Sequence, residues 1–141
     1  MCGIAGLIHK KDSGRVGSEM TSMLQSMKHR GPDSTGFAVY GLPKEGELAV
    51  RLKVAEREDL EKGFDIRDQI KQRKAEADRR ILELGGEIVA EEQATDYAWL
   101  LRIRYADDLR KLADYIEDIE GAEILSIGSA LELIKDLGDA N

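Results

Sequence analysis

The chain has 141 residues, of which 42% are hydrophobic and 35% are charged, and its formal net charge is −7. This length suits one domain of ordinary size or two small units, and the composition is typical of a globular protein rather than a disordered one. Because non-specific binding to nucleic acid needs a clustered basic face, the acidic balance argues against a nucleic-acid partner.

Three features of the sequence concern its compartment. Its longest apolar runs fall far short of the roughly 20 residues that cross a membrane, so we expect no membrane association. The start of the chain lacks the basic stretch and long apolar run of a secretory signal. A single cysteine cannot form an internal disulfide, which fits a reducing environment. The sequence therefore predicts a cytoplasmic protein.

Charge is spread unevenly along the chain. Residues 1–54 hold eight Lys and Arg against five Asp and Glu, whereas residues 55–141 hold thirteen against twenty-three. The first stretch is thus net basic and the second strongly acidic. This change of composition predicts two units, residues 1–54 and residues 55–141, that meet near Val54.

The first unit predicts a strand, a helix and two further strands. Small and β-branched residues at positions 3–9 indicate a buried strand. A helix follows, since apolar residues recur at helical spacing at Val16, Met20, Met23, Leu24 and Met27. Ser18, near the start of that helix, is a candidate cap. Residues 36–40 predict a second strand, and the alternation over residues 47–54 predicts a third.

The second unit has a recognisable order of elements. The pattern predicts a helix over residues 64–84, strands over 87–91 and 97–105, a helix capped by Asp107, a strand over 123–127, and a final helix with Ser129 and Glu132 as its capping box. Counting the strand at 47–54 as shared, the order is β-α-β-β-α-β, which is that of a ferredoxin-like unit. Right-handed crossovers would place both long helices on one face of a four-stranded antiparallel sheet. The predicted fold class is α+β.

The main chemical feature is Cys2, which directly follows the start methionine. If Met1 is removed, Cys2 carries a thiol and a free α-amine. A neutral α-amine, whose ordinary pKa is about 8, can accept the thiol proton directly or through water, so one residue would supply both nucleophile and general base. The alternative is that Cys2 is merely a small residue near a chain end. If Met1 is retained, the amine is absent.

A second motif, HRGPDSTG at residues 29–36, lies between the first predicted helix and the next strand, where functional loops concentrate. Pro32 stiffens the turn, and the glycines allow close backbone approach. Arg30 offers a rigid fork of donors that could order a carboxylate or the chain end. The alternative is an ordinary helix-to-strand turn in which Arg30 pairs with Asp33.

Other conspicuous residues predict structure rather than chemistry. The methionines of the first helix are interpreted as core residues. The aromatic residues of strand 97–105 lie on one alternating apolar face, which favours packing. His9 and His29 have no acidic or cysteine partner at metal-ligand spacing. We therefore expect no metal and no cofactor in this chain.

Together, MCGIAG at residues 1–6 and HRGPDSTG at residues 29–36 resemble the class II glutamine amidotransferases, whose glutaminase domain is an N-terminal-nucleophile hydrolase. The longer stretches MTSMLQSMKHRGPDSTGFAVYG and ADYIEDIEGAEILSIGSALELIKDLGDA look most like the stand-alone amidotransferase subunit of glutamate-synthase-type assemblies, including N-methylglutamate synthase. The resemblance implies that residues 1–54 begin an N-terminal-nucleophile hydrolase sandwich, and that residues 55–141 are an inserted unit.

The resemblance also implies a mechanism. Cys2 would attack the side-chain amide of L-glutamine, release ammonia and leave a γ-glutamyl thioester that water hydrolyses to glutamate, with the α-amine as proton carrier. The substrate pocket would be supported by Arg30, Gly31, Pro32, Asp33 and Ser34. The ammonia would pass to the active site of a synthase partner, and the missing remainder of the amidotransferase domain would be the other partner of this chain.

The family pattern extends further than this chain. It includes a later H-T-R segment, an Asn-Gly pair that builds the oxyanion hole and a later aspartate, none of which occurs before Asn141. Losing even one oxyanion donor lowers the rate by about 100-fold or more, so we expect the chain by itself to be inactive. The alternative hypothesis is a non-catalytic assembly or regulatory subunit of a glutamate-synthase-like complex that has kept both motifs as remnants.

Overall fold

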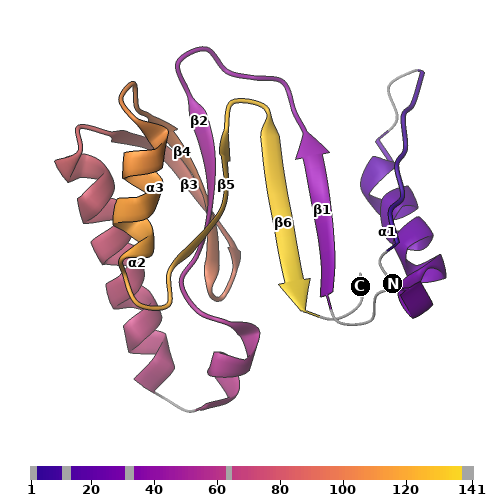
Figure 1. Cartoon of the computed structure of the whole chain (residues 1–141), viewed down its shortest axis with the longest axis horizontal. Helices are drawn as coiled ribbons and strands as arrows, with labels where there is room; N and C mark the ends of the chain where they lie inside the picture. Colours follow the sequence, from indigo (N-terminus) through magenta and orange to yellow (C-terminus); the bar gives the residue numbers. More distant parts are fainter. Residues whose placement is uncertain (1–2, 11–13, 31–33, 63–64, 138–141) are drawn as a thin grey trace. The chain divides into compact units, whose positions relative to one another are not determined.

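A computed structural model describes residues 3–10, 14–30, 34–62 and 65–137, and for residues 62, 65, 136 and 137 it describes the backbone (Figure 1). This part of the chain is α+β. Its elements, in chain order, are α1 (Val16–Ser26), the 3-10 turn η1 (Lys28–Arg30), β1 (Ser34–Tyr40), β2 (Leu48–Lys53), the 3-10 turn η2 (Arg57–Lys62), α2 (Asp65–Glu83), β3 (Glu87–Thr95), β4 (Ala98–Arg104), α3 (Leu109–Glu117), β5 (Glu123–Gly128) and β6 (Leu131–Leu137).

Four strands form one antiparallel sheet in the order β3-β4-β2-β5. Strand β2 comes first in the chain but lies inside the sheet, with Val50 opposite Leu101 of β4 on one side and Ile127 of β5 on the other. Helix α2 connects β2 to β3, helix α3 connects β4 to β5, and both lie on the same side of the sheet (Figure 1). Among the described elements of residues 38–134, no helix lies on the other face of the sheet.

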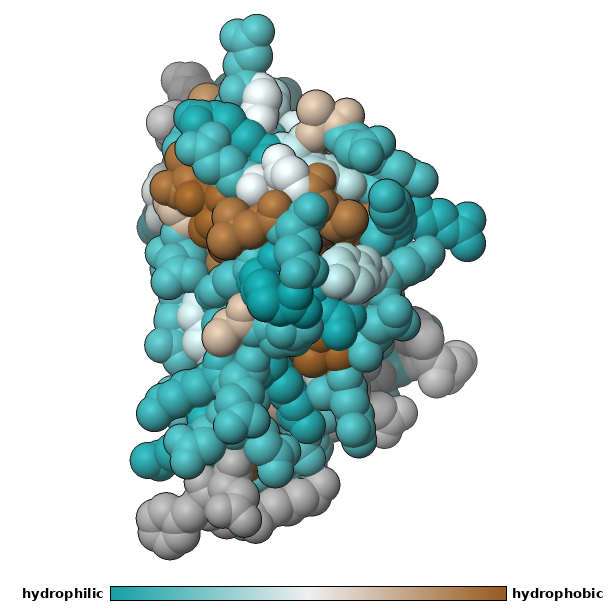
Figure 2. Space-filling view, turned by 90° about the vertical axis from the view of Figure 1, so that its left-hand side faces the viewer, coloured by the Kyte–Doolittle hydropathy of each residue, from teal (hydrophilic) through white to brown (hydrophobic). Residues whose placement is uncertain are grey.

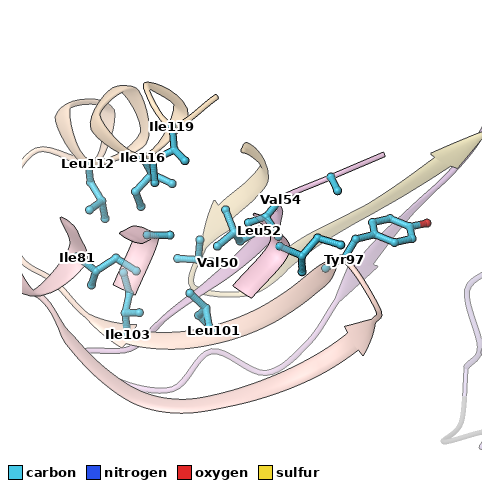
Figure 3. Packing of buried hydrophobic residues seen from close by; sticks show 14 residues of the cluster. Val50, Leu52, Val54, Ile81, Tyr97, Leu101, Ile103, Leu112, Ile116 and Ile119 are labelled. Atoms are coloured by element: carbon cyan, nitrogen blue, oxygen red, sulfur yellow. The ribbon is translucent and has the colours of Figure 1, made fainter. Parts of the chain in front are cut away.

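The hydrophobic core lies between the two helices and the sheet (Figure 3). Leu52 of β2, Ile103 of β4, Ile81 of α2 and Ile116 of α3 are fully buried there. These residues follow a period of two on the strands and a helical period on α2 and α3, which is why each element presents one apolar face to the others. Figure 2 shows the helix-covered side, which is mostly hydrophilic, with a hydrophobic patch in its upper half and a smaller one below it.

The ends of the two long helices are set by specific residues. Gly85 ends α2 with a positive φ of 83°, a backbone conformation that favours glycine, and the amide of Gly86 donates to the carbonyl of Ile81 at 2.9 Å. Helix α3 is capped by Asp108, whose side chain accepts hydrogen bonds from two amides of the first turn. The predicted cap, Asp107, is wrong by one residue: its carboxylate accepts instead from the amide of Asp108.

The final element is a strand, so the predicted helix after Ser129 is wrong. Strand β6 pairs with β1 in a second, two-stranded antiparallel sheet (Figure 1). Backbone and side-chain contacts fix it in this conformation: the amide of Leu133 donates to the hydroxyl of Ser126 at 2.9 Å, and Glu132 pairs with Arg102 at 3.0 Å. Glu132 is therefore used across strands rather than in a capping box.

The segment before α1 also differs from expectation. Residues 3–9 form no strand, because among the described residues no neighbouring strand pairs with them. Helix α1 is present where it was predicted, but its N-cap is Arg15 without a side-chain cap. Ser18 does not cap the helix, since its hydroxyl donates to the carbonyl of Arg15 at 3.0 Å.

Contacts divide the chain into two compact units, one of which is Ala38–Ile134 and the other the chain before and after it. Residues 38–54 thus group with the second unit, whereas the change of charge had suggested a boundary near Val54. The physical reason is that β2 pairs on both of its edges with strands of the second unit. In the described residues, no helix has the length and apolar character that a membrane crossing requires.

Candidate functional site

Of the residues that the sequence predicted for the site, the structure describes Arg30 and Ser34. Cys2, Gly31, Pro32 and Asp33 lie outside the described residues. Arg30 is the last residue of η1, and Ser34 is the first residue of β1. The amide of Arg30 donates to the carbonyl of Met27 at 2.8 Å, which fixes the turn after α1. The motif of residues 29–36 therefore connects a helix to a strand, as the sequence predicted.

The residue that follows Cys2 in the chain packs against this turn. A β-carbon built on Gly3 would lie 3.3 Å from Cβ of Arg30 and 3.7 Å from Cβ of Met27. Such a separation from Arg30 is tighter than ordinary van der Waals contact, so position 3 fits glycine best. The two motifs are distant in sequence, but the structure brings Gly3 of one into contact with Arg30 of the other.

A second contact holds the other end of the same segment. Nε2 of His9 lies 2.6 Å from Oε2 of Glu19 on α1, and Nε of Arg15 lies 3.8 Å from the other carboxylate oxygen. Sequence reasoning missed the pairing of His9 with Glu19, because the two residues are ten positions apart and follow no helical spacing. Of these two contacts of Glu19, only the one with Arg15, at i and i+4 on a helix, can be predicted from the sequence.

Two buried lysines elsewhere serve structure. Nζ of Lys53 lies 2.7 Å from Glu56 and 3.1 Å from Glu123. Burial lowers the pKa of Lys53, but the hydrogen bonds to Glu56 and Glu123 and the negative charges of these carboxylates together outweigh burial and raise the pKa above its ordinary value. Lys74 is likewise held between Asp78 and Glu91. Both amines are thus engaged by paired carboxylates.

A shallow depression on the second unit is a weaker candidate site, and it is lined by Gln69, Gln72, Arg73, Glu76, Ile119 and Glu120. Two of its charged side chains, Arg73 and Glu76, have structural partners. Arg73 donates to the carbonyl of Val54 at 3.0 Å. Hydrogen bonds from Arg79 and then Arg80 lower the pKa of Glu76 to about 2, so this carboxylate is ionised and paired at neutral pH. Among the described residues, no three His, Cys, Asp or Glu gather as a metal site.

Comparison with known proteins finds two relatives whose names agree with the family that the motifs resemble. Over 98% of its length the chain is 31% identical to a protein of Methanothermobacter thermautotrophicus named "Putative glutamine amidotransferase". Over 98% of its length it is also 30% identical to a glutamine amidotransferase-like protein, GlxB, of Rhizobium meliloti. The chain is therefore similar to glutamine amidotransferase-like proteins along nearly all of its sequence.

The similarity covers only part of each relative. The aligned region is 44% of the Methanothermobacter protein and 42% of the Rhizobium protein, so the chain spans less than half the length of either. No protein-family model and no solved structure matches the chain. The candidate site is accordingly defined by the two motifs and by the contact between Gly3 and Arg30.

Proposed function

We propose that this chain is the N-terminal part of a class II glutamine amidotransferase, with Cys2 as its nucleophile after removal of Met1. One structural observation carries the proposal: Gly3, the neighbour of Cys2 in the chain, packs against Arg30 at the start of the second motif. A nucleophile and the loop that holds its substrate must lie close together for reaction, and the contact of the neighbouring residue Gly3 with Arg30 supports such an arrangement. The similarity to two glutamine amidotransferase-like proteins supports it independently.

In the proposed chemistry Cys2 supplies both the nucleophile and the proton carrier, L-glutamine is the substrate, and the later part of the amidotransferase domain supplies the oxyanion donors. The α-amine of Cys2 takes the thiol proton, and the thiolate forms a bond to the carbonyl carbon of the glutamine side chain. The carbon–nitrogen bond of the amide breaks, and the proton passes from the amine to the departing ammonia. Water then hydrolyses the γ-glutamyl thioester to glutamate and restores the thiol. Arg30 and the loop through Ser34 support the substrate pocket.

The two units have different roles in this proposal. Residues 1–54 begin an N-terminal-nucleophile hydrolase sandwich, and residues 55–141, with β2 counted as shared, are a ferredoxin-like insertion. The succession of β2, α2, β3, β4, α3 and β5, together with the strand order β3-β4-β2-β5, supports the assignment of the insertion. The ammonia goes to a synthase partner of the glutamate-synthase or N-methylglutamate-synthase type, and the protein works in the cytoplasm.

Two measurements on the protein isolated from its native source test this function: its intact mass and its rate of glutamine hydrolysis. We expect an intact mass without Met1 and release of glutamate and ammonia from L-glutamine. Recombinant Cys2→Ala protein should lose glutamine hydrolysis and still form the same assembly. Retention of Met1, or glutamine hydrolysis undiminished in Cys2→Ala, would overturn the proposal and favour the assembly or regulatory subunit.

Two glycines of the first motif offer a matched test of the geometry. Gly3→Val places a side chain against Cβ of Arg30, so we expect glutamine hydrolysis to fall. Gly6→Val is the control, since a β-carbon there meets nothing within 4 Å among the described atoms. Equal activity of the two variants would argue against a role for the Gly3–Arg30 contact.

A further inference from the structure

The four-stranded sheet has two faces of different character. Val50 and Leu52 of β2 are buried in the core beneath the helices, so Arg51 between them lies on the opposite face, because successive side chains of a strand alternate. We call this side the open face, and the residues of β2 and β4 at its centre are Ala49, Arg51, Lys53, Ala98, Leu100 and Arg102. Arg51 lies opposite Leu100 of β4 on one side and Ser126 of β5 on the other, so it has a strand on each side.

Arg51 is an exception among the buried cations of the described residues. Six cationic side chains there are buried or half-buried: Arg51, Lys53, Arg73, Lys74, Arg80 and Arg102. Five of them bind a carboxylate or a backbone carbonyl. Arg51 has no hydrogen bond or ion pair with any described residue, and its Nε is buried without an acceptor. The described part of the chain therefore leaves this guanidinium without a partner.

The residues around Arg51 do not satisfy it. On the neighbouring strands lie the apolar Leu100 and the hydroxyl of Ser126, which already accepts from a backbone amide of β6 at 2.9 Å. Glu132, near the start of β6, pairs with Arg102 and not with Arg51. A half-buried charged donor without an acceptor destabilises a fold. We therefore expect Arg51 to serve an interaction that the described residues do not make.

The chemistry of the open face favours a carboxylate that is carried by a polypeptide. A guanidinium matches a carboxylate as a planar fork of donors, and the pair is stronger where apolar neighbours exclude water. The two terminal nitrogens of Arg51 are not among the buried unpartnered atoms, so an incoming carboxylate can reach them. The depression lined by Gln69 and Ile119 does not include Arg51. A sheet face of small and apolar residues suits a protein surface better than a free anion, which binds in concave sites.

We propose that Arg51 binds an aspartate or glutamate side chain of a polypeptide segment that covers the open face. The inference rests on the function proposed above, in which this chain is one part of a longer amidotransferase. The chain spans less than half the length of the two relatives, so the larger part of such a protein needs surfaces of this chain on which to pack. The segment on the open face belongs to that larger part, and Leu100 beside Arg51 supplies an apolar contact for it.

Modification of arginine by phenylglyoxal, mapped by mass spectrometry of peptides, tests the proposal. The recombinant chain of 141 residues is compared with the complete protein or assembly isolated from its native source. Arg51 should react in the chain alone and lose most of its reactivity in the complete protein, because the partner carboxylate covers its terminal nitrogens. Arg110 on α3, whose side chain is 89% exposed, is the matched control and should react equally in both.

Two substitutions on the open face separate a partner-binding role from a structural one. In the chain alone, Arg51→Met should leave the urea midpoint unchanged or raise it, since it removes a donor that has no acceptor. Arg102→Met should lower the midpoint, because it leaves the half-buried carboxylate of Glu132 without its partner. In the complete protein, Arg51→Met should also lower the midpoint, since the carboxylate of the covering segment then loses its partner. A lower midpoint for Arg51→Met in the chain alone would overturn the proposal.

Other occupants of the open face give different results. Equal reactivity of Arg51 in the chain and in the complete protein would overturn the proposal. Acetate or inorganic phosphate that protects Arg51 in the chain alone, to the level of the complete protein, would overturn the polypeptide partner in favour of a free anion. Protection that rises with the concentration of the chain would overturn it in favour of a second copy.

Failure of this inference is distinguishable from failure of the function on which it rests. A native protein of these 141 residues without a partner would overturn the covering segment together with the proposal that the chain is part of a longer domain. Glutamine hydrolysis that persists in Cys2→Ala would overturn the proposed catalytic role of Cys2 and would leave the protection of Arg51 in the complete protein as it is.

Discussion

Gly86 packs so closely against Ile81 that a β-carbon on the glycine would lie 2.7 Å from the Cγ2 methyl of Ile81 and 2.9 Å from its carbonyl oxygen. The carbonyl belongs to the backbone and cannot move aside without disturbing the end of α2. We expect Gly86→Ala to lower the free energy of unfolding by about 1 to 3 kcal/mol, the usual cost of forcing extra atoms into a packed site. Chemical denaturation measures this loss, and Gly41→Ala, which meets nothing closer than 4.0 Å among the described atoms, is the control.

The two ends of the apolar face of α3 should differ sharply in their contribution to stability. Ile116 is fully buried against the sheet, whereas Leu109 on the same helix is 39% exposed. We expect Ile116→Ala to cost about 2 to 5 kcal/mol of unfolding free energy, because it leaves a cavity, and Leu109→Ala to cost about 1 kcal/mol or less. Equal losses in urea denaturation would contradict the packing of α3 on the sheet.

The start of α3 gives a test that separates neighbouring aspartates. Asp108 accepts from the amides of Arg110 and Lys111 at 2.9 and 3.4 Å, whereas Asp107 accepts from the amide of Asp108 next to it. Asp108→Ala should therefore cost about 1 kcal/mol, the usual value of an N-cap, and Asp107→Ala less. The order of the two midpoints in thermal unfolding checks the prediction, and a reversed order would place the cap at Asp107.

Lys53 predicts a change of stability at alkaline pH. The folded-state pKa of Lys53 is raised above the ordinary value of 10.5. The contribution of Lys53 to the free energy of unfolding is therefore fully present below pH 10.5 and is lost as pH rises through the folded-state pKa. The stability of the parent relative to Lys53→Met should therefore be constant up to about pH 10 and fall above it. Denaturant unfolding at a series of pH values measures this difference. Lys71→Met, which alters an 80% exposed lysine, should show little such dependence.

Hydrophobic periodicity in the sequence was sufficient to predict the helices and strands whose apolar residues face the core. The helical stripe that includes Ile70 and Ile81 and the alternation of Leu101 and Ile103 each correspond to an element that buries those residues. Periodicity failed where the same pattern of residues is compatible with both a helix and a strand. The stretch from Leu131 carries signals of a helix start, yet its backbone pairs with β1, and no local pattern reports a partner so distant in sequence. The missing strand at residues 3–9 has the same cause, since a strand needs a neighbour.

The candidate site was predictable in its residue types and not in its contacts. Cysteine chemistry and the loop at Arg30 can be read from the sequence, because thiols and guanidinium groups have few roles. The packing of Gly3 on Arg30 and the pairing of His9 with Glu19 depend on how the segment lies beside α1. These contacts follow from the path of the backbone, so the structure was needed to find them.

The place of β2 inside its sheet has a consequence for how the protein is made. As the chain leaves the ribosome, β2 emerges well before β4 and β5, the strands on its two sides. The two edges of the strand at Val50 stay unpaired until Leu101 and Ile127, their partners, have been synthesised. Pairing between such distant residues is slow, because a long loop must close first. During synthesis the nascent chain thus presents an apolar strand with two open edges, and we expect that interval, rather than the finished fold, to be the stage most prone to aggregation.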